Sequence, residues 1–168
     1  MTRSATMLVF SAIALGAVSL ADRATAEGSL KDQLVGSWTF ASGGSTDPSG
    51  RQVWGEGTKG LLIFLENGRY SSQLMRSDLP KFGSGSRLQG SPEENKAVVQ
   101  GSVSSFGTFT VDEGKRAFTI KWEAHTFPNL TGQSQTRSFT ITGDELRIQN
   151  PGPTAGGPPS ELVYKRDK

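Results

Sequence analysis

The sequence of 168 residues contains no cysteine, which excludes disulfide bonds, thiolate catalysis and cysteine-based zinc sites. It contains a single histidine, His125, and neither an HExxH motif nor a paired-histidine spacing. Zinc usually takes several protein ligands, so we expect no metal site. A nucleophile elbow, a P-loop and a dinucleotide-binding fingerprint are also lacking, so we expect no cofactor and assign no catalytic residue.

An excess of charge of one sign is lacking as well. The chain has 18 basic and 16 acidic residues, which gives a formal net charge of +2. Domains that bind nucleic acid carry a basic patch or stripe. Because the charges are nearly balanced, the sequence gives a nucleic-acid partner no electrostatic support, and we expect none.

Long apolar runs are confined to the beginning of the chain. Residues 7–20 are apolar apart from serine and glycine, Arg3 precedes them, and the small-residue sequence Ala-Thr-Ala follows at 24–26. This is the pattern of a secretory signal peptide. The run is shorter than the ~20 residues of a spanning helix, so we expect no stable membrane span. We expect cleavage after residue 26, export to the periplasm or out of the cell, and one domain over 27–168.

The rest of the sequence shows short apolar segments separated by turn residues at fairly regular spacing, which is typical of an all-β barrel or sandwich. The predicted strands are 34–41, 60–65, 69–75, 105–112, 116–126, 134–142, 144–149 and 161–166, with 52–54 as a candidate for a ninth. A short turn is expected at 29–33. Ser91 followed by Pro92 and two glutamates is the one good helix start, and it predicts a short helix near 92–100.

Most strands have one polar, solvent-exposed face and one apolar face, because side chains alternate with a period of two. In 116–126, Phe118, Ile120 and Trp122 share a face, and in 134–142 Arg137 shares a face with Phe139. This alternation favours an up-and-down antiparallel barrel whose interior is lined by apolar side chains.

The segment GLLIFLENGRYSSQLMR, residues 60–76, has bulky apolar groups on both faces. Its Asn67-Gly68 dipeptide predicts a two-residue type I′ turn between two strands. The pairs that follow from this turn are Leu65 with Tyr70, Phe64 with Ser71, Ile63 with Ser72, Leu62 with Gln73 and Leu61 with Leu74. Polar groups opposite Phe64 and Leu62 favour a partly hollow interior with sparse hydrogen-bonding points. The helix near 92–100, or a second subunit, would cover the other face.

Five segments in order resemble the bacterial lipocalin-like domain family. They are LVGSWTF, GLLIFLENGRYSSQLMR, FGTFTVDEGKRAFTI, FPNLTGQSQTRSFTI and LVYKR, which together run through nearly all of 34–166. The first contains the G-x-W of lipocalins at Gly36 and Trp38. The resemblance implies an eight-stranded antiparallel up-and-down lipocalin-like barrel with one short helix. It implies little about activity, because this fold carries transporters, binding proteins and some enzymes. Ile120 and Lys121 stand where members of the family often carry histidine, so a role of that histidine is not expected here.

Six residues are candidate ligand contacts: Trp38, Trp54, Tyr70, Gln73, Trp122 and Arg137. Arg137 is the most informative, because a buried guanidinium needs a partner. That partner is a ligand carboxylate, which arginine binds with two parallel hydrogen bonds, or a group of the protein. The protein groups that fit are Glu56, Glu123 and the ring of Trp38.

In a regular strand His125 shares an outward face with Glu123, and a β-bulge near Ala124 would turn one of the two inward.

The main hypothesis is an exported protein that binds a small hydrophobic or amphipathic ligand, with loops 42–50 and 77–90 around the mouth. A second is an isomerase, cyclase or hydratase that uses acid–base chemistry at Glu56, Glu123, Tyr70 or His125. A third is a structural or interaction module in which the doubly apolar hairpin forms a homodimer.

Overall fold

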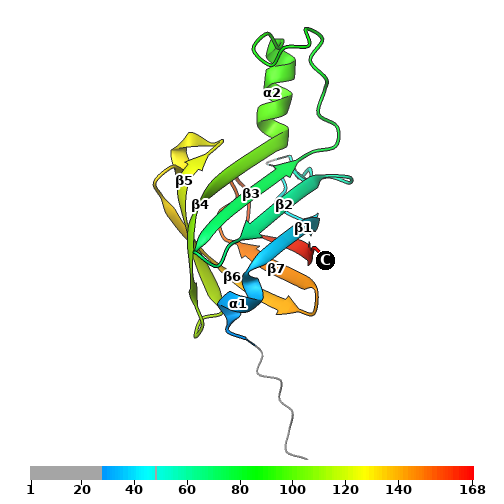
Figure 1. The fold of residues 1–168 in the computed structure, drawn as a ribbon. Helices are drawn as coiled ribbons and strands as arrows, with labels where there is room; N and C mark the ends of the chain where they lie inside the picture. Colours follow the sequence, from blue (N-terminus) through cyan, green and yellow to red (C-terminus); the bar gives the residue numbers. More distant parts are fainter. Residues whose placement is uncertain (1–27, 48) are drawn as a thin grey trace, which may run out of the picture.

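The computed structural model describes residues 28–47 and 49–168, and this part of the chain forms one closed barrel (Figure 1). Each strand pairs antiparallel with the next in sequence, and β8 pairs with β1. The strands are β1 (Gly36–Gly43), β2 (Lys59–Phe64), β3 (Arg69–Met75), β4 (Ser102–Asp112), β5 (Ala117–His125), β6 (Ser134–Thr142), β7 (Glu145–Asn150) and β8 (Ser160–Arg166). The helices are α1 (Leu30–Leu34), α2 (Pro92–Gly101) and the 3-10 helix η1 (Pro128–Leu130). The predicted eight-stranded up-and-down barrel is confirmed.

The short helix α1 replaces the turn expected at 29–33. Ser29 caps it: its hydroxyl accepts the N–H of Asp32 at 3.1 Å, and the carboxylate of Asp32 accepts the N–H of Ser29 at 3.1 Å. This reciprocal pair is a capping box, which satisfies two backbone donors at the helix start. Residues 52–54 are not a strand, since Gln52 only forms an isolated bridge with Thr46. The predicted signal peptide, 1–26, lies outside the described residues, and none of the described helices is long and apolar enough to span a membrane.

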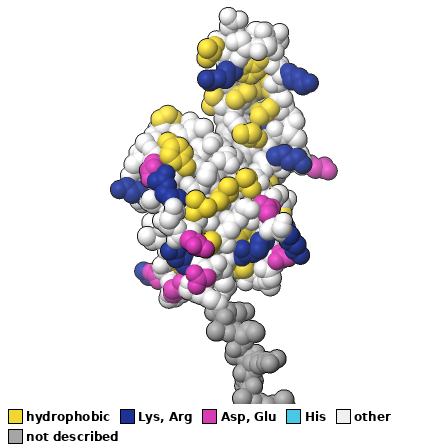
Figure 2. All heavy atoms as spheres, in the orientation of Figure 1, with side chains coloured by type: hydrophobic (Ala, Val, Ile, Leu, Met, Phe, Trp, Pro, Cys, Tyr) yellow, Lys and Arg dark blue, Asp and Glu magenta, His cyan; other side chains and the backbone are white. Residues whose placement is uncertain are grey.

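The predicted helix near 92–100 is present as α2, and its start is capped by Ser91 and Glu94. It projects from one end of the barrel (Figure 1). The helix α2 runs into β4 with no loop between them and does not lie over the hairpin. The expectation that this helix covers the hairpin is therefore wrong. Figure 2 shows hydrophobic side chains on the outer surface of the barrel. Leu65, just after β2, and Phe106 on β4 are both exposed. A homodimer through this face stays a prediction.

The turn between β2 and β3 differs from the predicted one. The N–H of Gly68 donates to the carbonyl of Leu65 at 2.9 Å, and the N–H of Leu65 donates to the carbonyl of Arg69 at 2.8 Å. Gly68 has a φ of 81°, whereas Asn67 has no positive φ. These features define a three-residue loop in which a type I turn is followed by a glycine in the left-handed region. The predicted type I′ turn is therefore wrong.

The extra loop residue shifts the pairing of the two strands by one position. Phe64 lies opposite Tyr70, and Leu62 lies opposite Ser72. The predicted pairing of Leu62 with Gln73 is wrong, because a one-residue slip sends alternate side chains to opposite faces. Tyr70 and Ser72 therefore face the interior, while Gln73 lies on the outer face of β3.

The end of the barrel next to α1 is filled by aromatic rings. Phe64 packs edge-on against Phe109 and Phe118, with ring centroids 4.8 and 5.3 Å away, and Phe118 lies 5.6 Å from Phe139. All four side chains are buried. Such edge-to-face pairs add stability beyond the burial of their area. This half of the interior is consequently a solid core.

Trp38 closes the same end and is fully buried. Its indole N–H donates to the carbonyl of Leu34 at 2.9 Å, and the guanidinium carbon of Arg166 lies 4.0 Å from the centre of its ring. Arg166 also donates to the backbone carbonyls of Val35, at 3.0 Å, and Gln33. The stacking on Trp38 that the sequence left open for Arg137 is thus made by Arg166, from the last strand.

A β-bulge interrupts the pairing of β4 with β5. Phe106 pairs with Ala124 and Gly107 pairs with Trp122, so Glu123 is an extra residue on β5. The bulge brings the β5 backbone close to Gly107. A Cβ atom at this glycine would lie 2.0 Å from a carbonyl oxygen of β5. Gly107 therefore has a local reason to lack a side chain.

Candidate functional site

The other half of the barrel, toward α2, contains a cavity of about 640 Å³. This volume lies within the range of pockets that hold small ligands. Its apolar wall is formed by Leu62, Phe64, Leu74, Phe118, Ile120, Trp122, Ile148 and Leu162. Phe64 and Phe118 are the upper surface of the aromatic core, so the core is also the floor of the cavity. The interior is therefore both a packed core and a partly polar pocket, at opposite ends.

Arg137 on β6 points into this cavity, as the alternation of its strand predicts. Its Nε donates to the side-chain oxygen of Gln135 at 2.7 Å. Among the residues that the structure describes, no carboxylate forms an ion pair with its guanidinium. Burial lowers the pKa of Arg137 from its ordinary value, and the nearby Tyr164 and Tyr70 oppose that shift. An arginine stays charged even so. The result is a cation in the barrel wall with part of its surface open to the cavity.

None of the protein partners considered for Arg137 pairs with it. Glu123 forms an ion pair with Arg69 on the outside of the barrel. Glu56 is exposed and does not line the cavity, and Trp38 is occupied by Arg166. The alternative that Arg137 serves a structural ion pair or ring stack therefore finds no support among the described residues.

Tyr70 and Tyr164 also line the cavity. The hydroxyl of Tyr70 lies 3.4 Å from that of Ser105, and burial raises the pKa of Tyr70. Tyr164 is almost completely buried, which raises its pKa to about 12 against the opposing charge of Arg137. Both phenols are therefore protonated near neutral pH. They can donate hydrogen bonds to an anion in the cavity.

His125 also lines the cavity, which contradicts the prediction that it faces outward. The bulge at Glu123 reverses the alternation, so that His125 lies opposite the buried Ser105. The Nδ1 atom of His125 accepts the N–H of Phe127 at 2.8 Å, which leaves Nε2 to carry the proton of the neutral ring. Burial, and then the charge of Arg137, lower the pKa of His125. A bulge near Ala124 is the condition under which the sequence predicts that Glu123 or His125 faces inward, and it is His125 that does so.

The mouth of the cavity is formed by loops and by the end of α2. Trp54 and the loop residues around it line one side, and residues 153–155 line another. Loop 42–50 contributes as predicted, but loop 77–90 does not border the cavity. The chain runs through 77–90 toward the far end of α2, away from the barrel (Figure 1).

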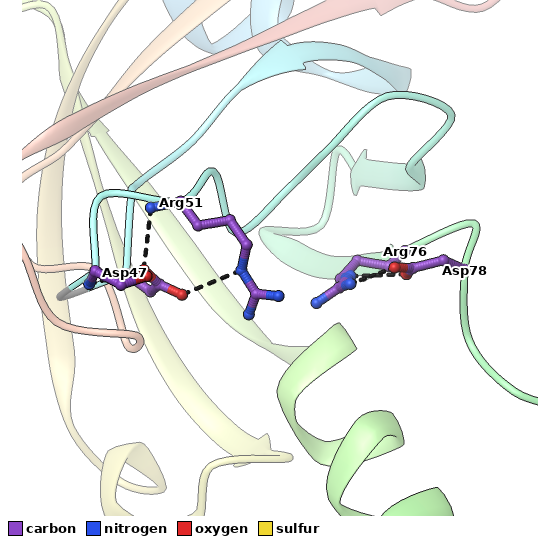
Figure 3. A network of polar contacts seen from close by, with 5 residues as sticks. Asp47, Arg51, Arg76 and Asp78 are labelled. Atoms are coloured by element: carbon purple, nitrogen blue, oxygen red, sulfur yellow. Dashed lines mark hydrogen bonds and ion pairs between the residues drawn. The ribbon is translucent and has the colours of Figure 1, made fainter.

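Two arginines stand at this mouth. Arg51 pairs with Asp47 at 3.2 Å, and Arg76 forms a two-point ion pair with Asp78. Figure 3 shows the two guanidinium groups pointing toward one another, each with its aspartate behind it. The hydrogen bonds from Arg76 lower the pKa of Asp78, and the charge of Arg51 acts in the same direction.

Four of the six predicted contacts therefore border the cavity, namely Trp54, Tyr70, Trp122 and Arg137, whereas Trp38 and Gln73 do not. Polar residues of the cavity that sequence reasoning missed include Ser72, Ser105, Tyr164 and the mouth arginine Arg51, and it placed His125 on the wrong face. Tyr164 could have been found, because it alternates with Leu162 on the last strand. His125 could not be assigned, since its direction depends on the bulge.

Within the described ranges, no group of three potential ligands is arranged to hold a metal ion.

Comparison with known proteins identifies the family of the chain. The model of a family described as a lipocalin-like domain matches residues 35–160. No curated protein matches the sequence. Two solved structures are similar to it at low identity. The "REP1-NXSQ fatty acid transporter" is 12% identical with a TM-score of 0.38, over 82% of this chain and 98% of that one. The fluorescent protein UnaG is 15% identical with a TM-score of 0.37, over 81% and 98%. These two likenesses are too weak to support a statement about a ligand.

Proposed function

Because this chain belongs to the lipocalin-like domain family and its barrel is hollow at one end, we propose that it binds a small hydrophobic or amphipathic molecule there. In this proposal the apolar part of the ligand fills the cavity and an acidic group is held by Arg137. Burial of apolar surface supplies affinity at ~25 cal/mol per Å². The few polar groups of the wall set the orientation.

The observation that carries the proposal is the guanidinium of Arg137. Taking a charge out of water is costly unless it is paired. Within the described residues, this guanidinium makes one side-chain hydrogen bond, from Nε to Gln135, and Arg137 lines the cavity. A ligand carboxylate would complete its coordination, and the protonated Tyr70 and Tyr164 can donate to the same anion. A neutral ligand would leave the charge of Arg137 without an ionic partner.

The test is the substitution Arg137→Gln, with hexadecanoic acid and hexadecanol as ligands of matched length. Binding is followed by the fluorescence of Trp54 and Trp122, which border the cavity. We expect the acid to bind roughly tenfold or more weakly to the variant, because hydrogen bonds to charged groups contribute about 1.5–3 kcal/mol. The alcohol should bind nearly as before. Arg147→Gln, on the outer face of β7, is the control. Equal losses for both ligands would contradict the anchoring role.

A second candidate function, acid–base catalysis, has one observation in its favour, the inward turn of His125. Tyr70 is the other candidate that borders the cavity, while Glu56 and Glu123 do not. Mass spectrometry of the small molecules that co-purify with wild type and with His125→Gln separates the two functions. A binding protein yields the same molecule from both, whereas an enzyme accumulates its substrate in the variant.

We also propose that the protein is exported and cleaved after residue 26. The support is the sequence alone, a basic start and an apolar run followed by a small-residue site. The intact mass of the protein isolated from its own cells tests this. A chain beginning at Glu27 is expected, and a chain that keeps residues 1–26 would contradict it.

A further inference from the structure

The ion pairs at the cavity mouth have an unusual order of charges. In Figure 3 the sequence across the mouth is Asp47, Arg51, Arg76 and Asp78, so the two cations lie in the middle and the two anions outside. Arg51, Arg76 and Asp47 all border the same cavity as Arg137. An anion between the two guanidinium groups could accept hydrogen bonds from both.

The aspartates use only one side of each guanidinium. Arg51 donates to Asp47 through Nε, and Arg76 donates to Asp78 through Nε and Nη2. Within the described part of the chain, this leaves both terminal nitrogens of Arg51 and the Nη1 of Arg76 without an acceptor. One oxygen of Asp47 is also taken by Ser49. These carboxylates therefore orient the arginines and leave their inner sides available to a ligand.

Arg76 is also held in place by its surroundings. Its side chain is 23% exposed, and its backbone N–H donates to the carbonyl of Gly101 at 2.8 Å. A Cβ atom at Gly101 would lie 3.2 Å from the Cδ of Arg76, so the stem of the arginine packs against the end of α2. Arg51 is 64% exposed and comes from the opposite loop. One fixed and one more exposed arginine thus face each other over the opening.

We propose that the ligand carries acidic groups at both ends, with one end at Arg137 inside the barrel and the other between Arg51 and Arg76 at the mouth. This inference rests on the proposed function, because it assumes that an acid is bound at Arg137. It goes further by naming the ligand class, a long apolar molecule with two terminal carboxylates or similar anions. The single cavity that reaches both sites fits a molecule extending from one to the other.

The experiment compares hexadecanedioic acid with hexadecanoic acid, and with the shorter dodecanedioic acid, on the wild-type protein. We expect one diacid to bind at least roughly tenfold more tightly than hexadecanoic acid, because a second charge-assisted contact is added. Tightest binding should occur at the length that spans the two sites, and a diacid that is too short should bind like a monoacid.

The variants Arg51→Gln and Arg76→Gln, alone and together, identify the outer site. The double variant should bring the diacid down to the affinity of hexadecanoic acid and leave hexadecanoic acid itself nearly unchanged. Arg51→Gln affects an exposed side chain, so it tests the site even where Arg76→Gln disturbs folding. Arg147→Gln is the matched loss of an arginine away from the mouth.

Two results would overturn the two-ended ligand while leaving the proposed function intact. One is equal affinity for the best diacid and hexadecanoic acid, with Arg137→Gln still weakening both. The other is a diacid preference that the mouth variants do not change. Equal weakening of monoacid and diacid by the mouth variants, with no effect of Arg137→Gln, would overturn both proposals. So would failure of both acids to bind.

Discussion

At the scale of single residues, two arginines point into the barrel and their surroundings give them different tasks. Arg166 lies over the ring of Trp38 and donates to two backbone carbonyls. Arg137 borders the cavity, and Gln135 is its one side-chain partner among the residues that the structure describes. The first is therefore expected to stabilise the fold and the second to bind the ligand.

Substitution of Arg166 should affect stability and leave binding unchanged. Arg166→Gln removes a cation–π contact and two charge-assisted hydrogen bonds, so we expect the free energy of unfolding to fall by about 2 kcal/mol. The affinity for hexadecanoic acid at a temperature where the variant is folded should stay the same. Urea denaturation and a fluorescence titration measure the two quantities. Arg137→Gln should leave the free energy of unfolding nearly unchanged, since this charge is desolvated and has little pairing within the protein. It should instead weaken the binding of hexadecanoic acid. Similar profiles for both variants would contradict the distinction.

The surroundings of His125 allow a prediction of how the free energy of unfolding depends on pH. Burial and the charge of Arg137 lower the pKa of His125 below its ordinary value of 6.5, so the unfolded chain binds a proton more readily than the folded chain. The free energy of unfolding should therefore decrease as the pH falls from about 6.5 toward the lowered pKa. Protonation at Nδ1 also removes the acceptor for the N–H of Phe127.

Proton NMR measures this titration directly, because only one histidine is present. Urea denaturation over the same pH range gives the stability, and His125→Gln should flatten that part of the profile. A pKa of His125 at or above the ordinary value in the folded protein would contradict its placement in the cavity.

At the scale of elements, the bulge between β4 and β5 decides which side chains reach the cavity. Gly107→Ala would place a Cβ atom 2.0 Å from one β5 backbone oxygen and 2.9 Å from the N atom of Glu123. Overpacking of this kind typically costs about 1–3 kcal/mol. We expect that loss in urea denaturation, together with a shift of the His125 NMR signals.

Gly114→Ala is the matched control for this substitution. Gly114 lies in the turn between the same two strands, has no positive φ, and a Cβ atom there would meet its nearest neighbour at 3.6 Å. Its effect should be small. If Gly107→Ala were tolerated as well as Gly114→Ala, the bulge would not require the glycine.

The elements themselves could largely be predicted from the sequence, because alternation and turn residues mark the strands. The hairpin register could not, since Asn67-Gly68 fits both a type I′ turn and a type I turn followed by a left-handed glycine. The choice between them moves Gln73 out of the cavity and Ser72 into it. The bulge was equally hidden, because it depends on the close approach of two strands and not on the composition of either. Arg137 was placed correctly because β6 is regular.

At the scale of the whole molecule, the barrel is divided into a solid end and a hollow end. Aromatic rings and Trp38 fill the first. The helix α1 lies at that end, and loops and α2 lie at the other (Figure 1). Sequence pattern and resemblance could predict the barrel but not this division, which depends on how large side chains from distant strands share one volume. The four rings that fill the floor come from β2, β4, β5 and β6.

The central claim is that an acidic group of the ligand lies at Arg137, and NMR of hexadecanoic acid labelled at the carboxyl carbon tests it most directly. Bound to wild type, the carboxyl signal should stay at its ionised position well below the pH at which an ordinary carboxyl takes up its proton, because Arg137 and the two phenols stabilise the anion. In Arg137→Gln the signal should titrate at a higher pH. A bound carboxyl that titrates alike in both proteins would contradict the account.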